Sequence, residues 1–206
     1  MSRSKSSGRW LKEHHSDVYV REAQASGYRS RAAFKLLEIQ RRDRILRPGM
    51  VVVDLGAAPG GWSKVAAEIS GANGRVIALD LLEMPEIAGV EFIRGDFSEN
   101  SVLEDLERRL GGAQVDLVLS DMAPNMSGIR AVDQARSMAL AELALGFAVK
   151  FCKPGAALLT KVFEGAGMPE FRLELKQSFA RVQTRKPDAS RARSREHYLL
   201  ATNYTV

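Results

Sequence analysis

Three glycines follow a short apolar run in the stretch VVVDLGAAPGGWSKV at residues 51–65. The run VVVDL is rich in β-branched residues and too short for an ordinary helix, which is typical of a buried strand in a parallel sheet. Glycines at 56, 60 and 61 allow a tight turn and bring backbone N–H groups close to a ligand, at the positive end of the next helix. The stretch predicts a nucleotide-type cradle, although its spacing is not the dinucleotide pattern G-x-G-x-x-G.

Acidic residues stand at the ends of four predicted strands, namely Asp54, Asp80, Asp96 and Asp121. In open α/β sheets this carboxyl edge is where ligands bind. A lone Asp at such a position is often a helix N-cap, but four in succession favour ligand contacts. Asp80 lies 19 residues after Gly61, the spacing expected of a carboxylate that accepts hydrogen bonds from a ribose diol.

One lysine interrupts the apolar stretch ALLTKVF at residues 157–163. An unpaired ammonium is costly in a buried strand, so Lys161 is a candidate for chemistry. Burial and a second cation favour the neutral amine, whereas neighbouring carboxylates favour the ammonium. The sequence leaves the balance between these opposing effects open.

Predicted strands and helices alternate along the chain, which indicates an α/β fold with a mostly parallel sheet covered on both faces. Helices are expected from the spacing of apolar residues at 29–45, 61–70, 98–110, 131–151 and 169–179. The expected strands are 51–55, 75–80, 90–96, 115–121, 155–163, 181–187 and 196–204. The last two of these seven strands are expected to be antiparallel neighbours at one edge.

The composition is that of one globular domain, with 206 residues of which 45% are apolar and 27% charged. We expect that domain at residues 29–206, after a basic N-terminal arm at residues 1–28. No apolar stretch reaches membrane-spanning length and the N-terminus lacks a signal-peptide core, so a cytoplasmic protein without a membrane partner is expected. A single cysteine, Cys152, and three histidines indicate neither a disulfide nor a zinc site.

Positive charge is concentrated at the two ends of the chain, although the net charge is only +5. Residues 1–47 hold 12 Lys and Arg against five acids, residues 48–184 hold 13 against 18, and residues 185–206 hold five against two. Two basic ends around a mildly acidic centre favour contact with nucleic acid. The candidate phosphate-binding residues are Arg29, Arg31, Arg41, Arg42, Arg191, Arg193 and Arg195.

The cradle by itself suits either a nicotinamide dehydrogenase or an S-adenosylmethionine enzyme. A dehydrogenase generally needs further sequence to hold its substrate, and little sequence remains here outside the predicted sheet. An S-adenosylmethionine site fits within one seven-stranded sheet, because the cofactor is small and its methyl group carries the reactivity.

Four blocks of sequence resemble the signature blocks of the FtsJ/RrmJ family of methyltransferases: 54–63, 120–128, 161–165 and 186–198. The resemblance extends over nearly the whole chain, except the first eight or nine residues and the tail after Tyr204. It implies a Rossmann-like, seven-stranded S-adenosylmethionine-dependent methyltransferase fold with an antiparallel edge strand. It also implies transfer of a methyl group from S-adenosyl-L-methionine to the ribose 2′-hydroxyl of a uridine in the A loop of 23S rRNA, in the large ribosomal subunit.

The resemblance also implies roles for individual residues. The family's catalytic tetrad falls on Lys35, Asp121, Lys161 and Glu196. We interpret Lys161 as the base, with Asp121 orienting it and the hydroxyl, and Lys35 and Glu196 completing the hydrogen-bond frame. The family's cofactor positions fall on Gly60, Trp62, Asp80, Asp96 and Asp121, and no metal is implied.

Other functions stay open at this point. Transfer-RNA and cap ribose methyltransferases share the tetrad, although no extra domain for recognising those substrates is evident. A non-catalytic RNA-binding ribosome-assembly factor would keep the basic ends but would not need Lys161 and Asp121. A nicotinamide oxidoreductase is the remaining alternative, and we expect a monomer that acts on a large RNA.

Overall fold

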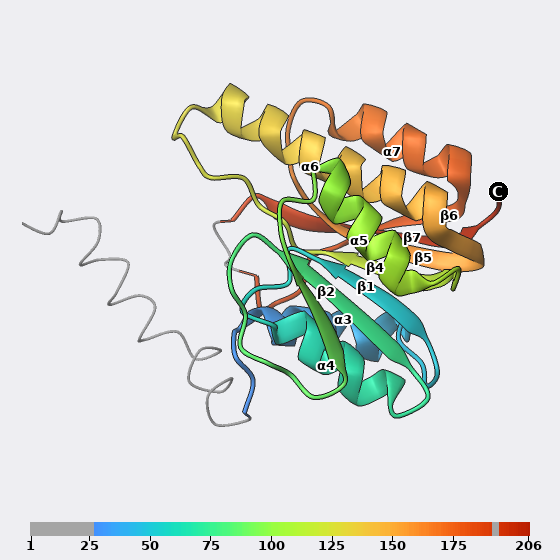
Figure 1. Ribbon diagram of the computed structural model, residues 1–206. Helices are drawn as coiled ribbons and strands as arrows, with labels where there is room; N and C mark the ends of the chain where they lie inside the picture. The colour runs from blue at the N-terminus through green and yellow to red at the C-terminus, as the bar shows by residue number, and fades with distance from the viewer. Residues whose placement is uncertain (1–26, 191–193) are drawn as a thin grey trace, which may run out of the picture.

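A seven-stranded sheet with helices on both faces makes up the computed structural model, which describes residues 27–190 and 194–206 (Figure 1). The strands are β1 (Val51–Leu55), β2 (Arg75–Asp80), β3 (Val90–Arg94), β4 (Val115–Ser120), β5 (Cys152–Phe163), β6 (Phe179–Arg185) and β7 (Glu196–Tyr204). The helices are α3 (Ala32–Asp43), α4 (Gly61–Ser70), α5 (Asn100–Leu110), α6 (Arg130–Phe151) and α7 (Met168–Ser178). The predicted α/β class and the alternation of strands and helices are therefore confirmed.

The strand order is β3-β2-β1-β4-β5-β7-β6, and the order reverses between β1 and β4. Strands β1 to β5 pair in parallel, whereas β7 runs antiparallel to both β5 and β6. The predicted antiparallel pair at one edge is confirmed, with β7 inserted between β5 and the edge strand β6. A reversal of strand order opens a crevice at the carboxyl ends of the strands, and ligands of open α/β sheets bind there.

Helices α3 and α4 cover one face of the sheet, and α5, α6 and α7 cover the other (Figure 1). Side chains of a strand alternate between the two faces. Leu117, Leu119 and Leu159 therefore pack in the core beneath α3 and α4, while Val118 and Leu158 pack beneath α5 to α7. Burial on both faces explains why these strands read as continuous apolar runs.

The borders of several elements differ from the sequence expectation by a few residues. Strand β5 begins at Cys152, directly after α6, although the expected strand began at residue 155. The ladder with β4 is irregular here, since Val115 pairs with Cys152 but Leu117 pairs with Ala157. Proline and glycine in this irregular stretch interrupt the apolar pattern, so the sequence does not indicate where the strand begins.

The predicted N-terminal arm is only partly covered by the structure. Of the predicted basic arm at residues 1–28, all but the last two residues lie outside the described part. Among the helices that the structure describes, none combines the length and the apolar character that crossing a membrane requires.

Candidate active site

Two glycines shape the loop between β1 and α4. Gly56 has φ +76° and Gly60 has φ +97°, in the left-handed region that favours glycine. A Cβ on Gly56 would lie 2.7 Å from Cγ of Met122, and a Cβ on Gly60 would lie 2.4 Å from Cδ1 of Ile87. Both positions therefore require glycine, because the loop packs closely between neighbouring segments of the carboxyl edge.

The acid at the end of β2 is bonded to the glycine loop. Oδ2 of Asp80 accepts a hydrogen bond of 2.9 Å from the N–H of Ala58, and Oδ1 accepts one of 2.8 Å from the N–H of Leu82. A carboxylate has about four acceptor sites, so both oxygens keep capacity for a ligand. Asp80 thus joins the loop to the end of the neighbouring strand.

The acid after β3 has a simpler environment. Oδ1 of Asp96 accepts from the N–H of Ser98 at 2.9 Å and from its hydroxyl at 2.7 Å. The hydrogen bonds from Ser98, first the hydroxyl and then the backbone, lower the pKa of Asp96. Asp96 is therefore a carboxylate at neutral pH, beside the carboxyl edge.

Asp54 is completely buried beneath the loop, at the end of β1. The hydroxyl of Ser63 donates to Oδ2 at 2.6 Å, while Oδ1 has no hydrogen-bond partner within the described part of the chain. Burial raises the pKa of Asp54 to about 7 against the hydrogen bond from Ser63, and the negative charges of Asp121 and Asp80 add to the rise. The sequence marked Asp54 as a strand-end acid but not its partner Ser63.

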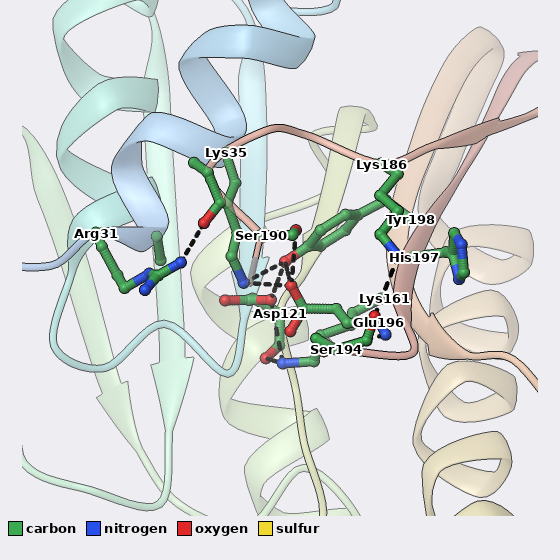
Figure 2. A network of polar contacts seen from close by, with 12 residues as sticks. Arg31, Lys35, Asp121, Lys161, Lys186, Ser190, Ser194, Glu196, His197 and Tyr198 are labelled. Atoms are coloured by element: carbon green, nitrogen blue, oxygen red, sulfur yellow. Dashed lines mark hydrogen bonds and ion pairs between the residues drawn. The ribbon is translucent and has the colours of Figure 1, made fainter. Parts of the chain in front are cut away.

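Two lysines and two acids meet at the ends of β4, β5 and β7 (Figure 2). Nζ of Lys161 lies 3.1 Å from Oδ1 of Asp121 and also donates to the main-chain carbonyl of Asp121. Nζ of Lys35 lies 2.5 Å from Oε1 of Glu196 and donates to the hydroxyl of Tyr198 at 3.0 Å. That hydroxyl donates to Oδ1 of Asp121 at 2.8 Å, so one network joins all five side chains.

The sheet register explains why these side chains converge. Lys161 pairs with Tyr198, and Phe163 pairs with Glu196, across the β5–β7 ladder. Lys161 lies two residues after Leu159, and side chains with this period share a face of the sheet. That face is covered by α3, from which Lys35 reaches the cluster on the helix's buried side.

The cluster is largely shielded from solvent. The side chains of Lys35 and Glu196 are 11% and 14% exposed, and those of Lys161 and Asp121 are 7% and 18% exposed. Charges at this depth are tolerated only when they are paired and hydrogen-bonded, which each of these four is. Burial raises the pKa of Tyr198 well above its usual value, and the nearby charges of Asp121 and Glu196 raise it further. The phenol therefore keeps its proton and serves as both donor and acceptor.

Sequence reasoning did not select Tyr198 or Ser190, although both belong to this network. The hydroxyl of Ser190 donates to Oε1 of Glu196 at 3.1 Å. Tyr198 had a detectable signal, because it follows Glu196 by two residues on one strand and must share its face. Ser190 had none, because its loop returns to the site only through the tertiary fold.

The indole of Trp62 belongs to the core. Its Nε1 donates to the carbonyl of Ala32 at 2.7 Å, and its ring centroid lies 5.4 Å from that of Tyr198. The residue is only 2% exposed. Its side chain therefore fixes α4 against α3 and supports Tyr198, while its backbone N–H lies in the first turn of α4, next to the glycine loop.

The predicted phosphate-binding arginines have varied environments. Arg41 and Arg42 are exposed in the last turn of α3, and Arg191 and Arg193 lie outside the described residues. The other three donate to main-chain carbonyls: Arg29 to Pro85 and Glu86, Arg31 to Ala189, and Arg195 to Glu164. Their phosphate contacts stay a prediction, and their observed role is to tie loops to the domain.

The strand order and the glycine loop at its switch point define the class: a Rossmann-like methyltransferase fold. In the part of the chain that the structure describes, no group of three or more His, Cys, Asp or Glu side chains is placed to hold a metal ion. The sequence pattern of the FtsJ-like methyltransferase family matches residues 28–204. The chain belongs to that family.

Relatives and solved structures agree with this assignment. The chain is 62% identical over 198 residues to a protein of Alkalilimnicola ehrlichii named ribosomal RNA large subunit methyltransferase E, covering 96% of this chain and 95% of that protein. A protein of the same name from Pseudomonas aeruginosa is 57% identical over 204 residues, covering 99% of each chain. A crystal structure from Plasmodium falciparum, described as a ribosomal RNA methyltransferase, matches with a TM-score of 0.77 at 29% identity, covering 86% of this chain and 98% of that one.

Proposed function

We propose that this protein transfers a methyl group from S-adenosyl-L-methionine to the ribose 2′-hydroxyl of a uridine in the A loop of 23S rRNA, within the large ribosomal subunit. Relatives across nearly the full length carry the name ribosomal RNA large subunit methyltransferase E. The observation that carries the chemical part of the proposal is the contact of 3.1 Å between Nζ of Lys161 and Oδ1 of Asp121 in a shielded cluster.

The carboxyl edge fits S-adenosylmethionine. The glycine loop leads directly into α4, so its backbone lies beside the positive end of that helix's dipole, which favours an anionic ligand group. We assign Gly60 and the backbone of Trp62 to the methionyl side of the ligand, together with Asp121.

Two further acids suit the nucleoside part of the ligand. Asp80 stands at the end of β2 with acceptor capacity for the ribose diol. Both hydrogen bonds from Ser98 reach Oδ1 of Asp96, which leaves Oδ2 to accept from the adenine amino group. These assignments follow the family positions and the acceptor counts of the two carboxylates.

Lys161 is the base of the proposed reaction. Bound S-adenosylmethionine supplies a methyl group on a sulfonium, so the protein must position the ribose hydroxyl and remove its proton. Nζ of Lys161 donates to the main-chain carbonyl of Asp121 and lies 3.1 Å from Oδ1 of the same residue. These two contacts fix the position of the nitrogen that, in this proposal, takes the proton of the 2′-hydroxyl.

The other members of the network hold Asp121 in place. Tyr198 donates to the oxygen of Asp121 that also contacts Lys161, and Lys35 supports Tyr198 from the opposite side. Glu196 neutralises Lys35 and keeps that ammonium beside the phenol. In this scheme Lys35 and Glu196 act through Asp121 and Tyr198, by fixing the direction in which Lys161 presents its lone pair.

The test uses large ribosomal subunits and total tRNA from cells that lack the gene, each incubated with the protein and S-adenosylmethionine labelled in its methyl group. We expect label on the 2′-oxygen of an A-loop uridine, and its loss in Lys161→Ala. The matched control is Lys153→Ala on the same strand, whose ammonium pairs with Asp116 at 2.5 Å away from the cluster. It should methylate at the wild-type rate.

The outcomes separate the alternatives. Label on tRNA alone would replace the substrate and keep the chemistry. Binding of RNA and S-adenosylmethionine without any transfer would favour an assembly factor, and binding of a nicotinamide cofactor instead would favour an oxidoreductase. A Lys161→Ala protein that binds both ligands and still transfers methyl at the normal rate would refute Lys161 as the base.

A further inference from the structure

Two large apolar side chains are exposed in the loop that follows Asp121. This loop, residues 122–129, connects β4 to α6 along the carboxyl edge. Met126 is 65% exposed and Ile129 is 61% exposed. Met126 is five residues from Asp121, a span of at most about 18 Å for a fully extended chain. These apolar side chains therefore stand in water within a short distance of the proposed catalytic cluster.

The loop that carries these side chains is held in a defined shape. Asp133, in the first turns of α6, accepts hydrogen bonds from the N–H and the hydroxyl of Ser127 at 2.7 Å each, and from the N–H of Gly128 at 3.1 Å. The bonds from Ser127 and Gly128 lower the pKa of Asp133, which is therefore a carboxylate at neutral pH. Ser127 in turn accepts from the N–H of Ile129 at 3.2 Å. The exposure of the apolar side chains is thus a feature of a braced loop.

The exposed charged residues on the loop and the first turns of α6 are basic. Asp133 is the only acid between residues 122 and 140, and it is buried beneath the loop. The exposed charged residues of this stretch are Arg130 and Arg136, and Arg136 donates to the carbonyl of Asn125 at 3.3 Å. Apolar side chains with basic residues beside them in the chain suit RNA, which offers apolar base faces on a phosphate chain.

We propose that Met126 and Ile129 form a platform for an RNA nucleobase next to the methylated nucleotide. The proposal rests on the proposed function, because it requires an RNA substrate at this edge. A ribose hydroxyl reaches the shielded Lys161 only when its nucleotide leaves the base stack. The neighbouring nucleobases then lose a stacking partner. An apolar protein surface replaces part of that lost stacking. Arg130 and Arg136 would approach the phosphates beside it.

The test compares Met126→Ala, Ile129→Ala and the double variant with Leu173→Ala, the matched control. Leu173 lies on α7 and is 60% exposed, so the control removes a similar exposed apolar side chain outside this loop. We expect the double variant to raise KM for RNA at least fivefold, because the nucleobase then loses its apolar contact surface. The Kd for S-adenosylmethionine, the thermal midpoint and the salt dependence of RNA binding should match wild type. The variant Met126→Leu should bind RNA as wild type does, because leucine keeps the apolar surface.

Direct binding separates failure of this inference from failure of the proposed function. The probe is a fluorescent RNA hairpin of A-loop sequence, and its affinity is measured by anisotropy without turnover. A wild-type protein that binds the hairpin but never methylates RNA would refute the proposed function alone. A double variant with wild-type affinity for the hairpin would overturn the platform. Weaker binding to whole subunits but not to the hairpin would also overturn it, because it would indicate a protein contact.

Discussion

Tyr198 donates a hydrogen bond of 2.8 Å to Asp121, across 77 positions of sequence. The phenol is thereby placed between the two halves of the cluster, with Lys35 on its other side at 3.0 Å. Replacing Tyr198 with Phe removes this hydroxyl without removing a charge from the site, so the substitution tests the hydrogen bond alone.

We expect Tyr198→Phe to lower kcat by about 2- to 10-fold, because a single hydrogen bond contributes about 0.5–1.5 kcal/mol. Asp121 keeps its contact with Lys161, and Lys35 keeps its contact with Glu196. The loss should therefore be much smaller than in Lys161→Ala, with an unchanged Kd for S-adenosylmethionine. Steady-state kinetics and calorimetric binding check both. A fall as large as that of Lys161→Ala would show that the phenol takes part in the chemistry directly.

The pair of Lys35 and Glu196 should be strongly coupled in stability. Removing one partner of a shielded ion pair leaves the other uncompensated, whereas removing both leaves no unpaired charge. We expect Lys35→Met and Glu196→Gln each to lower the free energy of unfolding by about 1–3 kcal/mol, and the double variant to lose less than the sum. Urea unfolding of all four proteins gives the coupling energy.

The control for this cycle is the exposed pair of Lys64 and Glu68 in α4. Their charged groups are 3.8 Å apart, and the side chains are 30% and 50% exposed. Exposed pairs one helical turn apart contribute about 0.3–0.5 kcal/mol, so the coupling should be small. Equal coupling in both cycles would contradict the idea that shielding makes the Lys35–Glu196 pair special.

Asp54 should make the stability depend on pH. Its pKa is about 7 in the folded protein and about 3.9 when unfolded, so the folded state binds the proton more tightly. The stabilisation by that proton is complete below about pH 4 and is lost as the pH rises through 7. The loss is on the order of 4 kcal/mol, at about 1.4 kcal/mol per pKa unit.

Urea unfolding at about pH 5, 6.5 and 8, which spans the pKa of about 7, measures this effect. Asp54→Asn removes the titrating group, so its stability should fall less over this range than that of wild type. Glu83→Gln is the control, because the side chain of Glu83 is 83% exposed and should leave the pH dependence unchanged. Identical slopes for wild type and Asp54→Asn would rule out this role for Asp54.

Arg29 should support the cofactor site although it lies outside it. Its guanidinium donates to the carbonyls of Pro85 and Glu86 at 2.5 and 2.7 Å. The same loop carries Met84 and Ile87, which occupy the space beside Gly60. The arginine therefore holds the segment against which the glycine loop packs.

We expect Arg29→Ala to raise KM for S-adenosylmethionine about 3- to 10-fold, consistent with two hydrogen bonds of about 0.5–1.5 kcal/mol each acting indirectly. The salt dependence of RNA binding should stay unchanged, whereas loss of a phosphate contact would reduce its slope. Arg41→Ala, at an exposed position in α3, is the comparison. A smaller salt slope with an unchanged KM for S-adenosylmethionine would favour the phosphate contact that the sequence suggested.

Much of the fold was predictable because its signals are local. Runs such as Val51–Leu55 and Arg75–Asp80 are β-branched and apolar, and they match the observed strands in both bounds. Parallel strands bring their carboxyl ends to one edge, so Asp80, Asp96 and Asp121 were expected near the glycine loop before any contact was known. The resemblance to a family then suggested which lysines to consider, and the structure brings Lys35 and Lys161 into one network.

The sequence by itself determined the order of strands and helices and the glycine loop, since these depend on residues close together in the chain. It also determined the edge at which the acids meet, because parallel strands end at the same edge. Only the tertiary structure decided that β7 enters between β5 and β6, that Lys35 pairs with Glu196 from 161 positions away, and that Arg29 serves a backbone loop. Strand order and the choice of partner for a charge depend on packing between distant segments. Such contacts leave no periodic pattern in the chain, so they become visible only when the segments are brought together.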